Sequence, residues 1–277
     1  MLGDNAPSGA EGPCQNRVMA DEQPPRFESF GIVGFGHFGR MLAGSLAGHG
    51  RVIVYDDDPT MLRDFPSGVK AGEIEDVAGC DVVVLAVPFS SLEAALGQVR
   101  DHVSPDSVVM DVVSTKARAS ELLESVLAGH ANLLATHPLF GPPSMTHVEQ
   151  GQHLVVTLAR GSRAEALVAF LESEFGLDVF RLDPNAHDES MAYMQALPFF
   201  IARALVRLDI LGLKDRELLA LPSFEKLATI AAIEEHHTQE MFDTSQLSNP
   251  YAASVRRRLL DVLEEIDAEL EVNQEKR

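Results

Sequence analysis

The chain has 277 residues, of which 45% are hydrophobic, and 22 Lys and Arg against 42 Asp and Glu give it a formal net charge of -20. This negative charge disfavours binding to nucleic acid or to an anionic membrane, so an anionic ligand would need a local positive site. Two cysteines do not make a disulfide framework, and because neither a run of ~20 apolar residues nor a signal peptide is visible, we expect a cytoplasmic protein without a membrane partner.

A glycine-rich turn follows the first predicted strand and leads into residues with helical apolar spacing. It has the spacing GxGxxG and consists of Gly34, Phe35, Gly36, His37, Phe38 and Gly39. The first glycine permits a tight turn, the second lets a pyrophosphate approach the backbone, and the third lets the helix pack close to the strand. Because a helix start also offers amide hydrogens to an anion, we assign these six residues to a dinucleotide site.

The second predicted strand, residues 51–55, is followed by Asp56, about 20 residues after the glycines, as the dinucleotide fingerprint requires. An acid there would accept the ribose hydroxyls of NAD and repel the 2′-phosphate of NADP. The alternative is a glycine turn in an unrelated α/β protein, with Asp56 as a helix cap. The register of strand, turn, helix and acid favours nucleotide binding, and we expect NAD as the cofactor.

Strands and helical stretches alternate over residues 27–182, which predicts an α/β fold of Rossmann type with a doubly wound, mostly parallel sheet. Residues 59–79 carry helix and turn signals. The continuous apolar run that follows suits a strand covered on both faces, and we add its last residues, Val87 and Pro88, to the cofactor site. Helices are expected at residues 92–99 and 163–175, and further strands at residues 107–114, 132–136, 153–158 and 178–182.

Three polar residues follow neighbouring strands at the edge where open α/β sheets bind ligands. His137 is the candidate general base, since a neutral imidazole has a pKa near operating pH; it could instead cap the loop before Pro138. Ser114 could hydrogen-bond a substrate hydroxyl or the histidine, and could also cap the next helix. Lys116 could reach a ligand carboxylate or a backbone carbonyl, or could lie solvated in the first helical turn.

Beyond Asp183 the pattern is helical, with no convincing strand. His187 and Asp188, near the start of this region, could orient a substrate or one another, or could form a helix cap. A long apolar helix at residues 192–211 needs a large partner surface, which predicts an all-helical domain that also forms a homodimer. The expected division is a disordered tail at 1–25, an NAD-binding domain at 26–182 and a helical substrate and dimerisation domain at 183–277. Neither metal-ligand spacing nor a hydrolase-type Ser, His and Asp order is visible, so we expect no metal.

The segment Ser114-Thr115-Lys116, followed by Thr136-His137-Pro138-Leu139-Phe140-Gly141-Pro142, resembles the prephenate/arogenate dehydrogenase family. The glycine turn, His187-Asp188 and Met191-Ala192-Tyr193-Met194-Gln195 fall in the order of that family, so the resemblance runs from about residue 30 to the C-terminus. It implies NAD(P)-dependent oxidative decarboxylation leading to tyrosine, by a Rossmann domain joined to a helical domain that dimerises.

The resemblance implies that His137 deprotonates the ring hydroxyl during hydride transfer and that Ser114 assists it. Where the family usually has an arginine for the substrate carboxylate, residues 222–227 offer only Lys226, which keeps the charge but lacks the bidentate fork. Residues 196–199 are apolar where many relatives have histidines, which could favour arogenate or a related amino-cyclohexadienyl substrate. The candidates for binding this carboxylate-bearing substrate are Lys226, Lys116, Gln195 and His187.

The leading hypothesis is an NAD-dependent dehydrogenase that converts prephenate to 4-hydroxyphenylpyruvate or arogenate to tyrosine. One alternative is a dehydrogenase of a related amino-cyclohexadienyl or 3-hydroxy acid substrate, although the His137-Pro138 segment argues against a 3-hydroxy acid. Another is a module that senses NAD without turnover.

Overall fold

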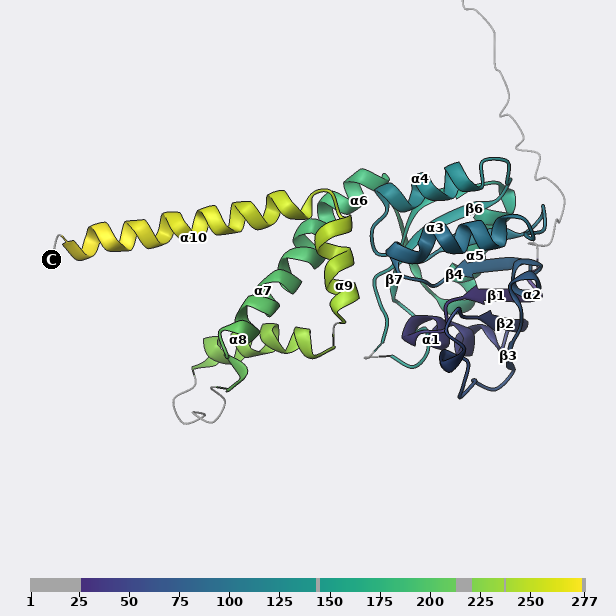
Figure 1. The fold of residues 1–277 in the computed structure, drawn as a ribbon, viewed down its shortest axis with the longest axis horizontal. Coiled ribbons are helices and arrows are strands. Elements are labelled where there is room, and N and C mark those ends of the chain that lie inside the picture. The colour runs from purple at the N-terminus through teal and green to yellow at the C-terminus, as the bar shows by residue number, and fades with distance from the viewer. Residues whose placement is uncertain (1–25, 143–144, 213–220, 237, 276–277) are drawn as a thin grey trace, which may run out of the picture.

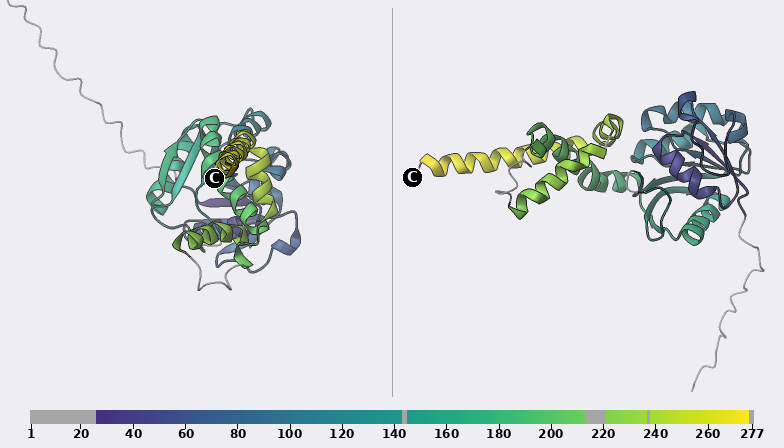
Figure 2. Two further views of the ribbon diagram at one scale, coloured as in Figure 1. Left: turned by 90° about the vertical axis from the view of Figure 1, so that its left-hand side faces the viewer. Right: turned by 90° about the horizontal axis from the view of Figure 1, so that it is seen from below.

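The computed structural model describes residues 26–142, 145–212, 221–236 and 238–275, so the tail predicted to be disordered lies outside the described residues. It shows a sheet with helices on both faces, from which the C-terminal helices extend to one side (Figure 1). The last helix, α10 (Ala252–Glu275), projects away from the sheet along the long axis of the molecule (Figure 2).

Eight strands form one sheet in the order β3-β2-β1-β4-β5-β6-β7-β8. All neighbours are parallel except β6 and β7, which confirms the mostly parallel sheet. The short strand β3 was not expected, because it has three residues and buries only the first of them. The strands are β1 (Ser29–Val33), β2 (Arg51–Tyr55), β3 (Val69–Ala71), β4 (Val82–Leu85), β5 (Val108–Asp111), β6 (Leu133–Pro138), β7 (His153–Arg160) and β8 (Asp178–Arg181).

The two faces of the sheet are covered by different helices. Val82 and Val84 of β4 pack with α1 and α5, whereas Val83 and Leu85 pack with α2, α3 and α4. Because every residue of β4 is buried on one face or the other, its apolar run is continuous, as expected for a central parallel strand. The covering helices are α1 (His37–Leu46), α2 (Ile74–Ala78), α3 (Phe89–Arg100), α4 (Ala117–Val126) and α5 (Ser162–Phe175), and a short 3-10 turn, η1 (Pro59–Met61), follows β2.

After β8 the described residues are helical. The Asp183 side chain caps the first of these helices by accepting the backbone amides of Asn185 and Ala186, with Pro184 in the first turn. The elements are α6 (Pro184–Met191), the π-helical turn η2 (Ala192–Ala196), α7 (Leu197–Arg207), α8 (Pro222–Ala232), the 3-10 turn η4 (Ile233–His236), α9 (Gln239–Asp243), the π-helical turn η5 (Thr244–Ser248) and α10. No helix within these described ranges is both long and apolar enough to cross a membrane.

The predicted helix at residues 192–211 is helical without a break from Ala192 to Arg207, but it is not a regular α-helix throughout. Its first five residues form η2, and Pro198, which has no amide hydrogen to donate, follows in the first turn of α7. Gln246 of η5 donates from Nε2 to the carbonyl oxygen of Ala196 at 2.7 Å, so a buried side chain supports this irregular turn. The helix then ends at Arg207, and Asp209 adopts a left-handed φ of 56°.

Candidate active site

The glycine turn has the backbone geometry that its sequence predicts. Gly34 has a φ of +96°, and a side chain at Gly39 would overlap the carbonyl oxygen of Gly34, so both positions require glycine. A Cβ atom at Gly36 would meet nothing within 4 Å, and this residue caps α1 without a side-chain hydrogen bond. The turn therefore leaves open space in front of the helix start, which fits a pyrophosphate.

Asp56 supports this turn from the end of β2. Its Oδ2 accepts the backbone amide of Phe35 at 2.7 Å, and its Oδ1 accepts that of Asp58 at 2.9 Å. Each carboxylate oxygen has a second lone pair, so ribose hydroxyls could still bind there. Phe35 itself is buried and stacks on Phe65, with ring centroids 5.4 Å apart, which leaves only its backbone to face a nucleotide.

A pocket of about 460 Å³ adjoins the turn and is lined by Gly36, His37, Arg40, Met61, Arg63 and Asp64. The guanidinium of Arg40 lies 4.3 Å from the centroid of the Phe35 ring and donates to the carbonyl oxygens of Met61, at 3.0 Å, and Asp64, at 2.9 Å. Arg40 thus fixes the loop that forms one wall of the pocket. Of the other predicted cofactor residues, Val87 lies next to Gly34, and Pro88 is the N-cap of α3.

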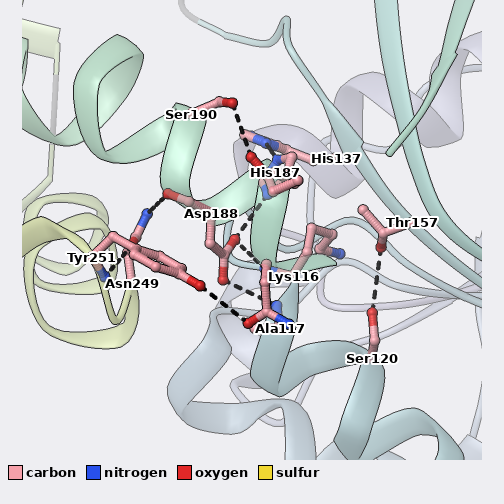
Figure 3. A network of polar contacts seen from close by, with 12 residues as sticks. Lys116, Ala117, Ser120, His137, Thr157, His187, Asp188, Ser190, Asn249 and Tyr251 are labelled. Atoms are coloured by element: carbon pink, nitrogen blue, oxygen red, sulfur yellow. Dashed lines mark hydrogen bonds and ion pairs between the residues drawn. The ribbon is translucent and has the colours of Figure 1, made fainter. Parts of the chain in front are cut away.

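His137 is the fifth residue of β6, and so lies at the carboxyl edge of the sheet that the sequence identified. It is buried, and Nδ1 lies 2.9 Å from Nε2 of His187 (Figure 3). Burial lowers the pKa of the His137 imidazole well below its ordinary value, and the nearby His187 and Lys116 side chains lower it further. The imidazole is therefore neutral at pH 7 and can accept a proton.

His187 and Asp188 orient one another, as one of the alternatives proposed: Nδ1 of His187 lies 2.8 Å from Oδ1 of Asp188. The carboxylate of Asp188 also accepts the backbone amides of Lys116 at 2.8 Å and Ala117 at 3.0 Å (Figure 3). Asp188 therefore caps α4 from a different helix. The expectation that Ser114 could cap α4 is wrong, because the N-cap residue is Lys116 and the capping oxygens come from Asp188.

Lys116 does not point towards a ligand. Its Nζ is fully buried, forms an ion pair with Asp111 and donates to the carbonyl oxygen of Thr136 at 2.6 Å. Burial lowers the pKa of Lys116 and raises the pKa of Asp111, while the charge of each partner opposes these shifts. The alternative that Lys116 reaches a backbone carbonyl is confirmed. The interpretations of Lys116 as a substrate ligand and as a solvated residue are wrong, because the side chain turns inward to the Asp111 carboxylate.

The remaining predicted site residues lie in different environments. Ser114, which follows β5, is half-buried and makes no hydrogen bond within the described part of the chain. Gln195 is half-buried in η2. Lys226 is exposed on α8, which packs on α7 at the end away from the sheet (Figure 1). The structure thus brings His137 and His187 together and does not place Lys226 beside them.

Two features of the site were not identified from the sequence. Asn249, which follows η5, donates from Nδ2 to the carbonyl oxygen of Asp188 at 2.7 Å, and so ties α6 to the segment that leads into α10. The buried pair of Asp111 and Lys116 lies under the strand ends. The sequence did contain a signal for this pair: Asp111 is the one acid in the otherwise apolar run of residues 108–113. A carboxylate in such a strand is expected to be buried and to need a partner.

Comparisons with known proteins find relatives of this chain. Residues 42–167 match the family model of the prephenate dehydrogenase nucleotide-binding domain. A probable arogenate/prephenate dehydrogenase of Methanocaldococcus jannaschii is 25% identical over 70% of this chain and 44% of its own length. The 4-amino-4-deoxyprephenate dehydrogenase of Streptomyces pristinaespiralis is 29% identical over 79% of this chain and 71% of its own length. The chain thus spans less than half of the first of these relatives.

The fold is also that of a solved structure. Prephenate dehydrogenase from A. aeolicus, in complex with hydroxyphenyl propionate and NAD+, has a TM-score of 0.70 at 20% identity. The alignment covers 92% of this chain and 94% of that chain. At this identity the likeness is one of fold, and it includes both the sheet and the helices that follow it.

Proposed function

We propose that this chain is a member of the prephenate/arogenate dehydrogenase family, whose nucleotide-binding domain its residues 42–167 match, and that it catalyses the NAD-dependent oxidative decarboxylation of a cyclohexadienyl substrate. The observation that carries this proposal is the neutral, buried imidazole of His137 at a strand end beside the glycine turn. Phe140, three residues further on, packs against Phe38 of α1 with ring centroids 6.4 Å apart. The strand end and the cofactor turn are therefore neighbours.

The residues present fit NAD. Open space in front of Gly36, an uncapped helix start and Asp56 at the end of β2 provide for a pyrophosphate and a ribose. The A. aeolicus structure of the same fold contains NAD+, which supports this choice. When bound, NAD would accept the hydride that leaves the carbinol carbon of the substrate.

His137 would accept the proton of the ring hydroxyl as the hydride leaves, so that a carbonyl develops and the ring carboxylate can depart as CO2. The hydroxyl of Ser114, which has no partner of its own among the described residues, would hydrogen-bond the same substrate oxygen. Gln195 and Lys226 are our candidates for binding the substrate. Lys226 has the required positive charge for a carboxylate and is exposed on α8.

We further propose that the helical part forms a homodimer. Four apolar side chains recur at helical spacing along α10 and are exposed to solvent in the single chain: Leu260, Leu263, Ile266 and Leu270. A row of this kind on a projecting helix is typical of a surface that a second helix covers. Light scattering of the purified protein would test this, and a monomer at micromolar concentration would contradict it.

The decisive assay compares prephenate, arogenate and 4-amino-4-deoxyprephenate, each with NAD and with NADP. We expect steady NADH formation with at least one of them. The amino compound is included because the S. pristinaespiralis relative, which is named for it, matches 79% of this chain. Its amino group, which replaces the ring hydroxyl, would present a proton to His137 in place of that hydroxyl. NAD binding without turnover of any of the three, or of a 3-hydroxy acid panel, would favour a sensing module.

A further inference from the structure

A line of hydrogen bonds runs from His137 into the protein interior. It passes from Nδ1 of His137 to Nε2 of His187, at 2.9 Å, and from Nδ1 of His187 to Oδ1 of Asp188, at 2.8 Å (Figure 3). His187 and Asp188 have no solvent-exposed surface, and His137 is 5% exposed. Each hydrogen on this line must therefore be shared with a protein neighbour.

The carboxylate at the inner end sets the direction of all these hydrogen bonds. Both oxygens of Asp188 accept backbone amides at the start of α4, where the positive end of the helix dipole favours a carboxylate. Asp188 is thus an acceptor, so Nδ1 of His187 carries the hydrogen. A neutral His187 then has its lone pair on Nε2, which accepts the hydrogen on Nδ1 of His137. The lone pair of His137 is left on Nε2, on the opposite side of its ring.

The surrounding charges decide where a positive charge would reside after His137 accepts a proton. The titratable groups near this imidazole are Asp111 on β5, Lys116 before α4, and His187 and Asp188 on α6. A positive charge on His187 and the ammonium of Lys116 each oppose a positive charge on His137. His187, in contrast, is in direct contact with the carboxylate of Asp188. A positive charge is therefore more stable on His187 than on His137.

We propose that His187 and Asp188 are positioning residues that act as a proton relay for His137, an inference that rests on the proposed dehydrogenase function. Nε2 of His137 takes the proton from the substrate hydroxyl, and the hydrogen on Nδ1 of His137 moves to Nε2 of His187. One O–H and one N–H bond break and two N–H bonds form. His137 ends neutral, and the imidazolium of His187 lies beside Asp188. After the product leaves, the hydrogen returns from Nε2 of His187 to Nδ1 of His137, and the proton on Nε2 of His137 passes to water, which resets the site.

The first test is the position of the hydrogens in the resting protein. Long-range ¹H–¹⁵N spectra of the full chain, labelled at histidine, distinguish the two tautomers, and the variants His137→Asn and His187→Gln assign the signals. We expect both histidines with hydrogen on Nδ1 and a free Nε2 on His137. A hydrogen on Nε2 of His137 would overturn the proposal. Because this measurement needs no substrate, it separates failure of the relay from failure of the proposed activity.

The second test removes charge transfer while keeping the orientation. In His187→Gln, the amide oxygen can accept from His137 and the amide nitrogen can donate to Asp188, but the side chain takes no proton. We expect an unchanged His137 tautomer and a kcat lower by roughly 10- to 100-fold, with KM nearly unchanged. A kcat equal to that of the wild type would overturn the relay. The matched control is His130→Gln, since His130 bonds the Ser107 carbonyl oxygen at 2.8 Å, away from this site, and should leave kcat unchanged.

A third variant removes the negative charge at the inner end of the line. In Asp188→Asn, an amide oxygen in the place of Oδ1 still accepts from Nδ1 of His187 and from the Lys116 amide, but it no longer offsets the charge of a His187 imidazolium. We expect an unchanged His137 tautomer and a kcat lower by about 10- to 100-fold. An unchanged kcat would contradict the relay even if His187→Gln does not fold.

Discussion

The carboxylate of Asp188 accepts the backbone amide of Lys116 at 2.8 Å, and so joins the helical part of the chain to the sheet at the start of α4. Seventy-two residues separate the two partners along the chain. The same carboxylate orients His187, which in turn contacts His137. One buried side chain thus connects helix capping, domain contact and the candidate general base.

Replacing Asp188 by alanine should destabilise the protein. The start of α4 would lose its cap, at a cost of about 0.5–2 kcal/mol, and the buried Nδ1 of His187 would lose its acceptor at a further ~1–3 kcal/mol. Thermal and denaturant unfolding would measure the loss. Asp183→Ala is the control, because Asp183 caps α6, is exposed, and its side chain has no histidine partner. This variant should lose only the stability that a helix cap contributes, about 0.5–2 kcal/mol. Equal losses in the two variants would contradict the double role.

The lowered pKa of His137 predicts a specific pH dependence of stability. As pH falls below about 6.5, this histidine takes up a proton in the unfolded chain but stays neutral when folded, so the unfolded state binds more protons. The free energy of unfolding should therefore decrease with falling pH, by up to ~1.4 kcal/mol per pH unit, until the folded pKa is reached. Urea titrations from pH 7.5 to 5 would show this slope.

In the variant His137→Asn, the free energy of unfolding should lose the pH dependence that His137 contributes. The variant should also have a kcat lower by about 10²- to 10⁴-fold, while it still folds and binds NAD. Calorimetry with NAD provides the control. If the variant turned over substrate at the wild-type rate, His137 would not be the base.

Position along the sheet was predictable from the sequence, whereas side-chain direction was not. The apolar runs and the glycine turn placed Ser114, Lys116 and His137 at one edge, because parallel strands align their carboxyl ends. Where the Lys116 side chain points depends on Asp111, whose buried carboxylate attracts the ammonium inward. A helix cap was one predicted role of His187 and Asp188, but that Asp188 caps α4 could not be anticipated, since it depends on how α6 packs against α4 and no local spacing encodes that contact.

The buried pair of Asp111 and Lys116 predicts a non-additive mutant cycle. Lys116→Met keeps the volume of the side chain but leaves a fully buried carboxylate unpaired, which should cost about 3–5 kcal/mol of unfolding free energy. The double variant Asp111→Leu, Lys116→Met removes both charges and should recover most of that loss. Denaturant unfolding of the single variants Lys116→Met and Asp111→Leu and of the double variant measures the coupling. Additive losses would show that the two charges do not depend on each other.

Asp56→Ser should relax the choice of cofactor. A serine can still bond a ribose hydroxyl but does not repel a 2′-phosphate, so kcat/KM with NADP should rise relative to NAD by at least about tenfold. Asp56 also holds the Phe35 amide, and serine could lose that contact. Asp56→Asn is therefore the control, because it keeps an acceptor oxygen of the same reach while removing the charge. If neither variant changes the NAD preference, Asp56 does not select the cofactor.

Lys226 is the remaining candidate for the substrate carboxylate, and kinetics can isolate its role. Lys226→Ala should raise KM for the cyclohexadienyl substrate by about tenfold and leave KM for NAD unchanged, since a charge-assisted hydrogen bond contributes roughly 1.5–3 kcal/mol. Lys226→Arg provides the matched control, because its planar fork can bind a carboxylate through two hydrogen bonds and should lower KM for the substrate. Lys226 is exposed, so neither change should alter thermal stability by more than about 0.5 kcal/mol. Equal small effects of Lys226→Ala on both KM values would exclude Lys226 from the substrate site.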